Sequence, residues 1–279
     1  MRIALILLTL LASLSNVPAC SASGPVIPNF WDPQEKFIRP NVKSTPRLRF
    51  LTTTDFPPFS YVDSEKRLSG FHVDLARAIC TELELPKVCQ IQALPFDQLK
   101  EALETGRGEA ILAGISVVPQ TVRDFEFSRP YFRIPARFVA SKSAGLGEPL
   151  IDRLAGADVG VVDQTAHAAF AQAHFGAMKV RVFASLDDAL AAMQKGEVKA
   201  VFGDGLNLAY WLQGKTAAEC CSFVGDPYLS ERYFGQGLTI AVRKGNLELS
   251  DALDYALRSI NDKGIFAELY LRYFPISLF

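Results

Sequence analysis

The sequence predicts an α/β fold in which strands alternate with helices and form open, parallel sheets. Continuous apolar runs at 110–115 and 159–162 have the length and composition of strands that are buried on both faces. Residues 70–83 instead carry an apolar side chain at every fourth position, which is the pattern of a helix with one buried face. A chain of 279 residues accommodates one large domain or two medium ones.

The expected elements follow one another in a regular order. Thr165 and Ser185 are suited to begin helices, and Gly196 to end the second of them. Two further helices are expected near the C-terminus, around 253–257 and 265–271. Strands are expected at 47–51, 88–93, 110–115, 159–162, 199–202 and 238–242. In open sheets ligands lie at the carboxyl ends of strands, and this rule selects Thr52–Phe56, Ser116, Thr165 and Asp204.

Composition and charge exclude several classes of protein. Hydrophobic residues make up 49% and charged residues 21% of the chain, which argues against disordered, collagen-like and coiled-coil proteins. Twenty-nine Lys and Arg against thirty Asp and Glu give a net charge of −1, so no nucleic-acid or anionic-membrane partner is expected. The chain has three histidines, no glycine-rich phosphate loop and no Gly-x-Ser-x-Gly elbow. We therefore expect no metal, no cofactor and no catalytic residue.

The N-terminus has the three parts of a secretory signal. Arg2 precedes an apolar run at 3–12, and small residues follow up to position 22. We expect a signal peptide at residues 1–22, and cleavage after Ala22 or, alternatively, after Ala19 would leave a free periplasmic protein. Residues 17–20 also form a weak lipobox, so the alternative is a lipid anchor at Cys20.

The cysteines fit an oxidising compartment. Cys80 and Cys89 lie nine residues apart, between a predicted helix end and a strand start, which is within disulfide reach. Cys220 and Cys221 are adjacent, so either a strained disulfide ring or two thiols are compatible with the sequence. Five prolines at 23–46 exclude regular structure, and the aromatic residues between them favour an arm strapped onto a surface over a disordered linker.

Four segments carry a recognisable pattern. They are Asp-Phe-Pro-Pro-Phe-Ser-Tyr at 55–61, Gly-Phe-His-Val-Asp-Leu-Ala at 70–76, Ala-Gly-Ile-Ser at 113–116 with Phe-Glu-Phe-Ser-Arg-Pro-Tyr at 125–131, and Tyr-Phe-Gly at 233–235 with 240–245. In these segments the chain resembles the bacterial family 3 extracellular solute-binding proteins, which serve ABC importers of polar amino acids. The resemblance implies a two-lobed periplasmic-binding-protein type II fold joined by two hinge strands. Lobe 1 would comprise 47–139 and 237–279, and lobe 2 would comprise 140–236.

The resemblance also implies a ligand-binding site. Phe56 would stack on the ligand side chain, and Ser116, beside Gly114, would contact its amine or carboxylate. Thr165, with His167 in the same helical turn, would hold the α-carboxylate at a helix N-terminus. Asp204 would accept the α-ammonium group through charge-assisted hydrogen bonds.

The chain departs from the family at Thr121, where the family has the arginine that grips the ligand carboxylate. A threonine cannot replace that charged fork. The carboxylate would then bind through N–H groups alone or through Arg133 or Arg137, or the ligand would have no α-carboxylate.

The expected function is that of a monomeric, non-catalytic solute-binding protein. It would capture an amino acid or a derivative between the lobes and deliver it to a membrane ABC permease. The alternatives are a ligand sensor or partner of a periplasmic oxidoreductase, with the arm at 23–46 as its contact surface, and an enzyme that resembles cyclohexadienyl dehydratase.

Overall fold

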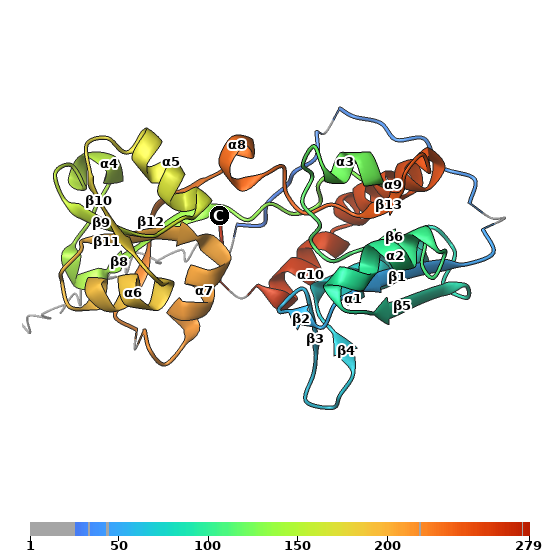
Figure 1. Cartoon of the computed structure of the whole chain (residues 1–279), viewed down its shortest axis with the longest axis horizontal. Coiled ribbons are helices and arrows are strands. Elements are labelled where there is room, and N and C mark those ends of the chain that lie inside the picture. The colour runs from blue at the N-terminus through green and yellow to red at the C-terminus, as the bar shows by residue number, and fades with distance from the viewer. Residues whose placement is uncertain (1–25, 33, 43–44, 218, 275) are drawn as a thin grey trace, which may run out of the picture.

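A computed structural model of the protein describes residues 26–32, 34–42, 45–217, 219–274 and 276–279. The predicted signal segment and Cys20 lie outside the described residues. The chain forms two lobes, each with a five-stranded sheet (Figure 1). Among the described residues no helix combines the length and the apolar character that a bilayer crossing requires.

The sheet of lobe 1 has the strand order β5-β1-β6-β13-β7. Strand β1 is parallel to β5 and β6, whereas β13 is antiparallel to β6 and β7. These strands are β1 (Leu48–Thr52), β5 (Cys89–Ala93), β6 (Ala110–Ile111), β7 (Phe125–Phe127) and β13 (Ala241–Arg243). A small antiparallel sheet of β2 (Asp55–Phe56), β3 (Ser60–Val62) and β4 (Leu68–Ser69) precedes the first helix.

Helices cover both faces of this sheet. One apolar cluster lies under α1 (Phe71–Glu82), α9 (Leu247–Asp262) and α10 (Ile265–Tyr273). A second cluster lies under α2 (Leu99–Glu104), which follows the short 3-10 helix η1 (Phe96–Gln98). The short α3 (Thr121–Asp124) precedes β7.

The sheet of lobe 2 has the strand order β10-β9-β11-β8-β12. Its strands are β8 (Ala136–Ser141), β9 (Asp158–Val162), β10 (Lys179–Phe183), β11 (Ala200–Asp204) and β12 (Cys221–Tyr228). Helices α4 (Leu150–Arg153) and α5 (Ala166–His174) pack on one face, and α6 (Leu186–Gln194) and α7 (Gly205–Gln213) on the other. The 3-10 helix η2 (Lys142–Ala144) follows β8, and α8 (Glu231–Phe234) lies beyond β12.

Side-chain caps fix where three helices of lobe 2 begin. The hydroxyl of Thr165 accepts a hydrogen bond from the N–H of Ala168 (3.1 Å) at the start of α5. Ser185 caps α6 in the same way, as the sequence predicts. Asp204 caps α7, a helix that the sequence analysis missed because it follows β11 without a loop. Such caps satisfy N–H groups that the helix itself leaves unpaired.

The predicted strand at 110–115 is too long, because the regular strand ends at Ile111. Gly114 has φ 73°, a left-handed conformation that a strand does not contain. A Cβ atom at this position would lie 2.9 Å from a ring carbon of Phe56. The chain therefore turns away from the sheet here and passes directly beside Phe56. The sheets are also mixed rather than purely parallel, because β13 and β8 run antiparallel to their neighbours.

Two segments cross between the lobes. The N–H of Leu238 donates to the carbonyl of Phe132 (2.7 Å), and the N–H of Tyr131 donates to the carbonyl of Leu238 (3.0 Å). A Cβ atom on Gly237 would lie 2.6 Å from that Phe132 oxygen, so only glycine fits there. The sheet of lobe 2 already begins at Ala136, so the first crossing ends earlier than the expected boundary at 140.

The described part of the N-terminal arm lies against lobe 1. Trp31 and Val42 are buried in the lobe 1 core, and the Trp31 ring meets Phe37 edge-on at 5.6 Å. The guanidinium of Arg258 on α9 donates to the carbonyl of Asp32 (2.6 Å). An ion pair between Glu35 and Arg129 adds a second polar attachment.

Two disulfides are present. The predicted bridge between Cys80 and Cys89 joins the end of α1 to the start of β5. The adjacent Cys220 and Cys221 are also bonded to each other, which resolves the alternatives that the sequence left open.

Loss of the first disulfide is expected to lower the free energy of unfolding. Replacing both Cys80 and Cys89 by Ala frees a short loop and should cost about 2–3 kcal/mol. This corresponds to a melting temperature about 4–12 °C lower for a chain of this size. The matched control is Cys220→Ala with Cys221→Ala, which opens no loop of intervening residues. Equal melting temperatures for the two double variants would contradict the loop-closure explanation.

Candidate ligand-binding cleft

The lobe 1 side of the cleft contains a hollow of about 260 Å³ lined by two phenylalanines, here called the phenyl hollow. Phe56 is held from behind by Phe59, with ring centroids 4.8 Å apart and planes 29° apart. Phe96 is 57% exposed, which is unusual for a phenylalanine, and lines the same hollow. The other lining residues are Thr53, Asp55, Ala113 and Gly114. An exposed carboxylate that lines the same hollow as two aromatic rings suits an organic cation.

The sequence selects Asp55 only as part of the range Thr52–Phe56, without a role, and does not select Phe96. Asp55 belongs to β2, which follows the carboxyl end of β1, and Phe96 opens η1 just after the carboxyl end of β5. These are neighbouring parallel strands, so their carboxyl ends meet at one edge of the sheet. The strand-end rule that selects Phe56 after β1 also selects Phe96 when it is applied to β5.

Two more hollows continue from the phenyl hollow. The central hollow, about 380 Å³, shares Gly114 with it and is lined by Ser116 and, from the other side, by residues 231–238. The hinge hollow, about 90 Å³, shares Ile134 and Glu231 with the central hollow and contains Arg133. Because neighbouring hollows have lining residues in common, the three form one groove along the cleft.

The predicted residues of lobe 2 gather at the start of two helices. The Thr165 hydroxyl donates to the carbonyl of Val162 (2.7 Å) and accepts from the N–H of Ala168, so it is fully used in capping α5. The backbone N–H groups of the first turn remain the groups that can receive an anion here. His167, in that turn, stacks on Phe234 of α8 with ring centroids 4.9 Å apart and planes 19° apart.

Asp204 combines a structural and an electrostatic role. Its Oδ1 accepts from the N–H of Asn207 at 2.9 Å. Burial raises the pKa of the Asp204 carboxyl, although the N–H of Asn207 and the nearby His167 lower it in part. Burial lowers the pKa of His167, while the Asp204 charge raises it. An incoming ammonium or guanidinium group would stabilise the ionised form of Asp204.

Thr121 cannot act as an anion clamp in this structure. Its hydroxyl donates to the carbonyl of Ser116 (2.6 Å) and accepts from the N–H of Val118 (3.0 Å), so it stabilises its own turn. Arg137 is also committed elsewhere, because its guanidinium donates to the carbonyls of Leu278 (2.8 Å) and Gly225 (3.0 Å).

Arg133 differs from Arg137 in lining the groove. Its Nη2 lies 3.4 Å from Glu231 Oε1, which is a long contact to an exposed side chain. Its Nε is buried and has no partner among the described residues. Of the two arginines named by the sequence analysis, only Arg133 is placed to meet a ligand.

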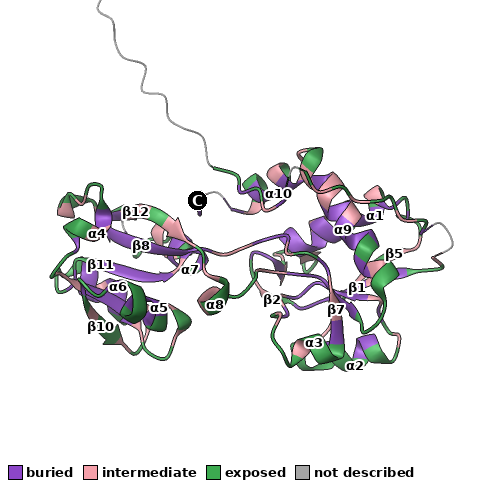
Figure 2. Cartoon of the chain, turned by 90° about the horizontal axis from the view of Figure 1, so that it is seen from above, coloured by how far each residue is buried: buried purple, intermediate pink, exposed green. Residues whose placement is uncertain are grey.

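The structure therefore brings the predicted residues together in two groups. Phe56, Gly114 and Ser116 lie along the groove in lobe 1, and Thr165, His167 and Asp204 lie together in lobe 2. Among the described residues no hydrogen bond or ion pair joins a member of one group to the other, and the lobes stand apart (Figures 1 and 2). Within the described part of the chain no cluster of His, Cys, Asp and Glu is arranged to hold a metal ion.

Known proteins resemble this chain over most of its length. An Escherichia coli K12 protein named for arginine binding in ABC transport is 34% identical over 229 residues, covering 81% of this chain and 90% of its own. The L-arginine-binding protein of Pseudomonas aeruginosa is 30% identical over 226 residues, covering 80% and 86%. These relatives are named as binding proteins.

Solved structures share the fold. An ancestral cationic amino acid solute-binding protein has a TM-score of 0.61 at 25% identity and covers 84% of this chain and 97% of its own. The unliganded L-cystine receptor of Neisseria gonorrhoeae has a TM-score of 0.71 at 19% identity, covers 83% and 94%, and supports the fold alone. An ancestral amino-acid-binding protein described as a precursor of cyclohexadienyl dehydratase matches at 24% identity with a TM-score of 0.51 and covers 84% and 97%.

Residues 48–276 match the family described as bacterial extracellular solute-binding proteins, family 3. The match covers both sheets, the crossing segments and the groove between them. It agrees with the predicted type II periplasmic-binding-protein fold and with a solute-binding role. The chain belongs to the bacterial extracellular solute-binding proteins of family 3.

Proposed function

We propose that this protein captures a small cationic amino acid, arginine or a close analogue, between its lobes without chemical change. We further propose that it does so as a monomer in the periplasm and presents the closed complex to the permease of an ABC importer. The observation that carries this proposal is the phenyl hollow, which Asp55 lines together with Phe56 and Phe96 and to which no lysine or arginine contributes. Relatives named for arginine binding support the same ligand class.

Each lobe would bind a different end of the ligand. A guanidinium group would enter the phenyl hollow, where the ring faces attract a cation and Asp55 accepts its N–H donors. The α-ammonium group would reach Asp204, and Ser116 would line the path between the two. A ligand stabilises the closed form only through contacts that it makes in the closed form and not in the open form. Because the lobes are separated in the open form, a ligand bound to lobe 1 gains its contacts with lobe 2 only on closure.

A thermal-shift screen tests the proposed function. The probes are arginine, lysine, ornithine, histidine, glutamine, glutamate and cystine, each at a large excess over the protein. A ligand at 100 times its Kd stabilises a protein by about 2.7 kcal/mol. We expect the largest shift with arginine and none with glutamate. A larger shift with glutamate or cystine than with every cationic amino acid would overturn the proposal.

Arg133 is proposed to supply the carboxylate clamp that Thr121 cannot provide. Its unpartnered Nε and its long contact with Glu231 leave donors for an anion, and guanidinium groups bind carboxylates through two parallel hydrogen bonds. The ligand would then extend from the phenyl hollow through the central hollow to the hinge hollow.

The substitution Arg133→Gln tests this role with two ligands. It should weaken arginine binding about 10- to 100-fold, which is the range for a lost charged hydrogen-bonding pair. Binding of agmatine, which lacks the carboxylate, should change less than twofold in calorimetric titration. Arg153→Gln is the matched control, because Arg153 is an exposed arginine on α4 of lobe 2 and lines none of the three hollows. Equal losses for arginine and agmatine would show that Arg133 acts on the hinge and not on the carboxylate.

A further inference from the structure

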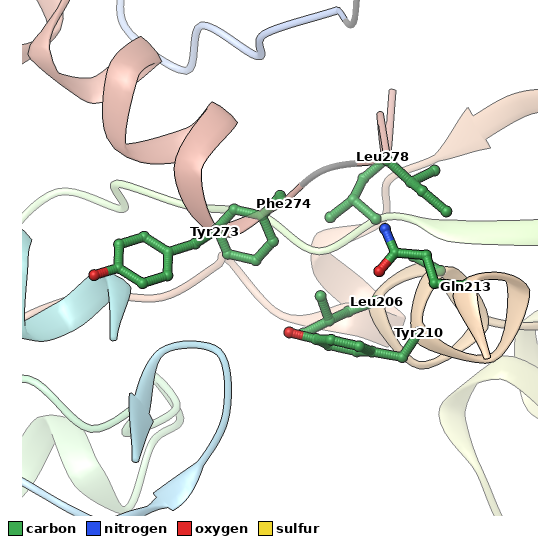
Figure 3. A pocket seen from close by; sticks show the side chains of 8 residues that line it. Leu206, Tyr210, Gln213, Tyr273, Phe274 and Leu278 are labelled. Atoms are coloured by element: carbon green, nitrogen blue, oxygen red, sulfur yellow. The ribbon is translucent and has the colours of Figure 1, made fainter. Parts of the chain in front are cut away.

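The C-terminal tail, residues 276–279, reaches lobe 2 although the preceding helix α10 belongs to lobe 1. Leu278 is fully buried, and its side chain lies with Phe274 against α7 of lobe 2 (Figure 3). Leu206 and Ala209 of α7 belong to the same apolar cluster as Phe274 and Leu278. The tail is thus a third connection between the lobes, besides the two crossing segments.

Polar contacts attach the tail to lobe 2. Arg137 of β8 is buried, and its guanidinium donates to the carbonyl of Leu278 (2.8 Å) and to that of Gly225 in β12 (3.0 Å). The same guanidinium lies 4.5 Å from the centre of the Phe223 ring. A buried cation needs such partners, so loss of the tail would remove part of what stabilises Arg137.

The tail is also attached to lobe 1 and to the hinge. The N–H of Leu278 donates to the hydroxyl of Tyr270 on α10 (3.3 Å). The ring of Phe279 meets Phe30 of the N-terminal arm at 5.8 Å, and Phe30 in turn lies 6.4 Å from Phe132 in the first crossing segment. These contacts hold both lobes and the hinge at one relative position.

The position of the tail determines which state it favours. In Figure 2 the C-terminus lies on one side of the crossing segments and α8 on the other. Helix α8 lines the central hollow, so the groove is on the side opposite the tail. A rotation about the crossing segments that closes the groove must therefore separate the tail from α7.

We propose that residues 276–279 act as a clasp that stabilises the open arrangement of the lobes and so reduces the affinity for ligand. The effect on affinity rests on the proposed function, whereas the effect on lobe separation does not. When the clasp is weakened, a larger fraction of the free protein is closed. Apparent affinity rises in proportion to the fraction of protein that is competent to bind.

The test uses the mature chain with Leu278→Ala and Phe279→Ala, which keeps the backbone acceptor for Arg137. Small-angle scattering without ligand should give a smaller radius of gyration than that of the unaltered protein. Calorimetric titration with arginine should give about three- to tenfold tighter binding. Leu271→Ala on the exposed face of α10 is the matched control and should change neither quantity.

A second variant distinguishes a weakened clasp from a loss of the fold. Leu206→Ala weakens the same contact from the side of lobe 2 and should produce the same two changes, with circular dichroism confirming an intact fold. An unchanged radius of gyration in both folded variants, or weaker arginine binding, would overturn the clasp. If arginine does not bind at all, the proposed function fails while the scattering result still decides the clasp.

Discussion

Replacement of Asp204 by Asn is expected to weaken binding of the cationic ligand by about 100-fold, close to 2.7 kcal/mol. Asn keeps an oxygen that can accept from the N–H of Asn207, so the start of α7 is preserved. What is lost is the charge, and hydrogen bonds to charged groups contribute about 1.5–3 kcal/mol. The loss is expected in this upper range because the carboxylate lies beside the buried start of α7 and the Phe234–His167 stack.

Calorimetric titration at pH 7 measures this effect. Asp187→Asn is the matched control, because Asp187 is an exposed acid in the first turn of α6, outside the cleft. Its affinity should equal that of the unaltered protein. An affinity for Asp204→Asn within threefold of the unaltered protein would show that Asp204 serves only as a helix cap.

Replacement of Asp254 by Asn is expected to stabilise the fold at pH 8 by about 2–4 kcal/mol. Asp254 on α9 is buried, and its Oδ1 accepts from the N–H of Arg129 at 2.6 Å. Burial, together with the charges of Asp251 and Glu35, raises the pKa of Asp254 to about 7 against the opposing N–H and charge of Arg129. Above pH 7 the native state must hold this carboxylate ionised in the core. Asn keeps the acceptor and removes the charge.

The same substitution should reveal a second buried group. Burial lowers the pKa of His72 to about 3, and the ring instead shares a 2.7 Å hydrogen bond with the Tyr131 hydroxyl. Between about pH 4 and 6.5 the unfolded chain binds more protons at His72, so stability rises with pH. Over the same window the native state binds more protons at Asp254, so stability falls with pH.

These opposing slopes should make the unaltered protein nearly insensitive to pH between about 4 and 6.5. In Asp254→Asn the His72 contribution is no longer opposed by that of Asp254, and the His72 contribution lowers the free energy of unfolding by about 1.4 kcal/mol per pH unit on acidification. Denaturant unfolding from pH 4.5 to pH 8 measures both effects. Asp187→Asn, an exposed acid on α6 of lobe 2 that does not contribute to the pKa of Asp254, serves as the control. A flat profile in Asp254→Asn would mean that His72 does not contribute.

The sequence predicts features that depend on neighbours along the chain. Thr165 and Ser185 were identified as helix starts because a cap acts over three residues. The role of Arg137 was not predictable, since its acceptor on Leu278 is 141 residues away in the sequence. Thr121 was recognised as a departure, yet only the structure reveals that its hydroxyl is occupied by its own turn.

Some residues of the candidate site are likewise predictable from the sequence, whereas others are recognised only in the folded structure. Strand-end positions such as Phe56 and Asp204 follow from the rule for open sheets. Phe96 becomes part of the site only where two chain segments meet in space, at the phenyl hollow. Its 57% exposure, a property of the folded chain alone, is what distinguishes it from a core phenylalanine.

The strand order of lobe 1 has a consequence for the sequence of events during folding. Strand β13, which lies between β6 and β7, comes from the last part of the chain, whereas β8 to β12 form a continuous stretch. A growing polypeptide can therefore complete the second lobe while the first still lacks a strand and has unpaired edges that invite aggregation. The sheet of the first lobe can be completed only after β13 has been synthesised, later than every strand of the second lobe.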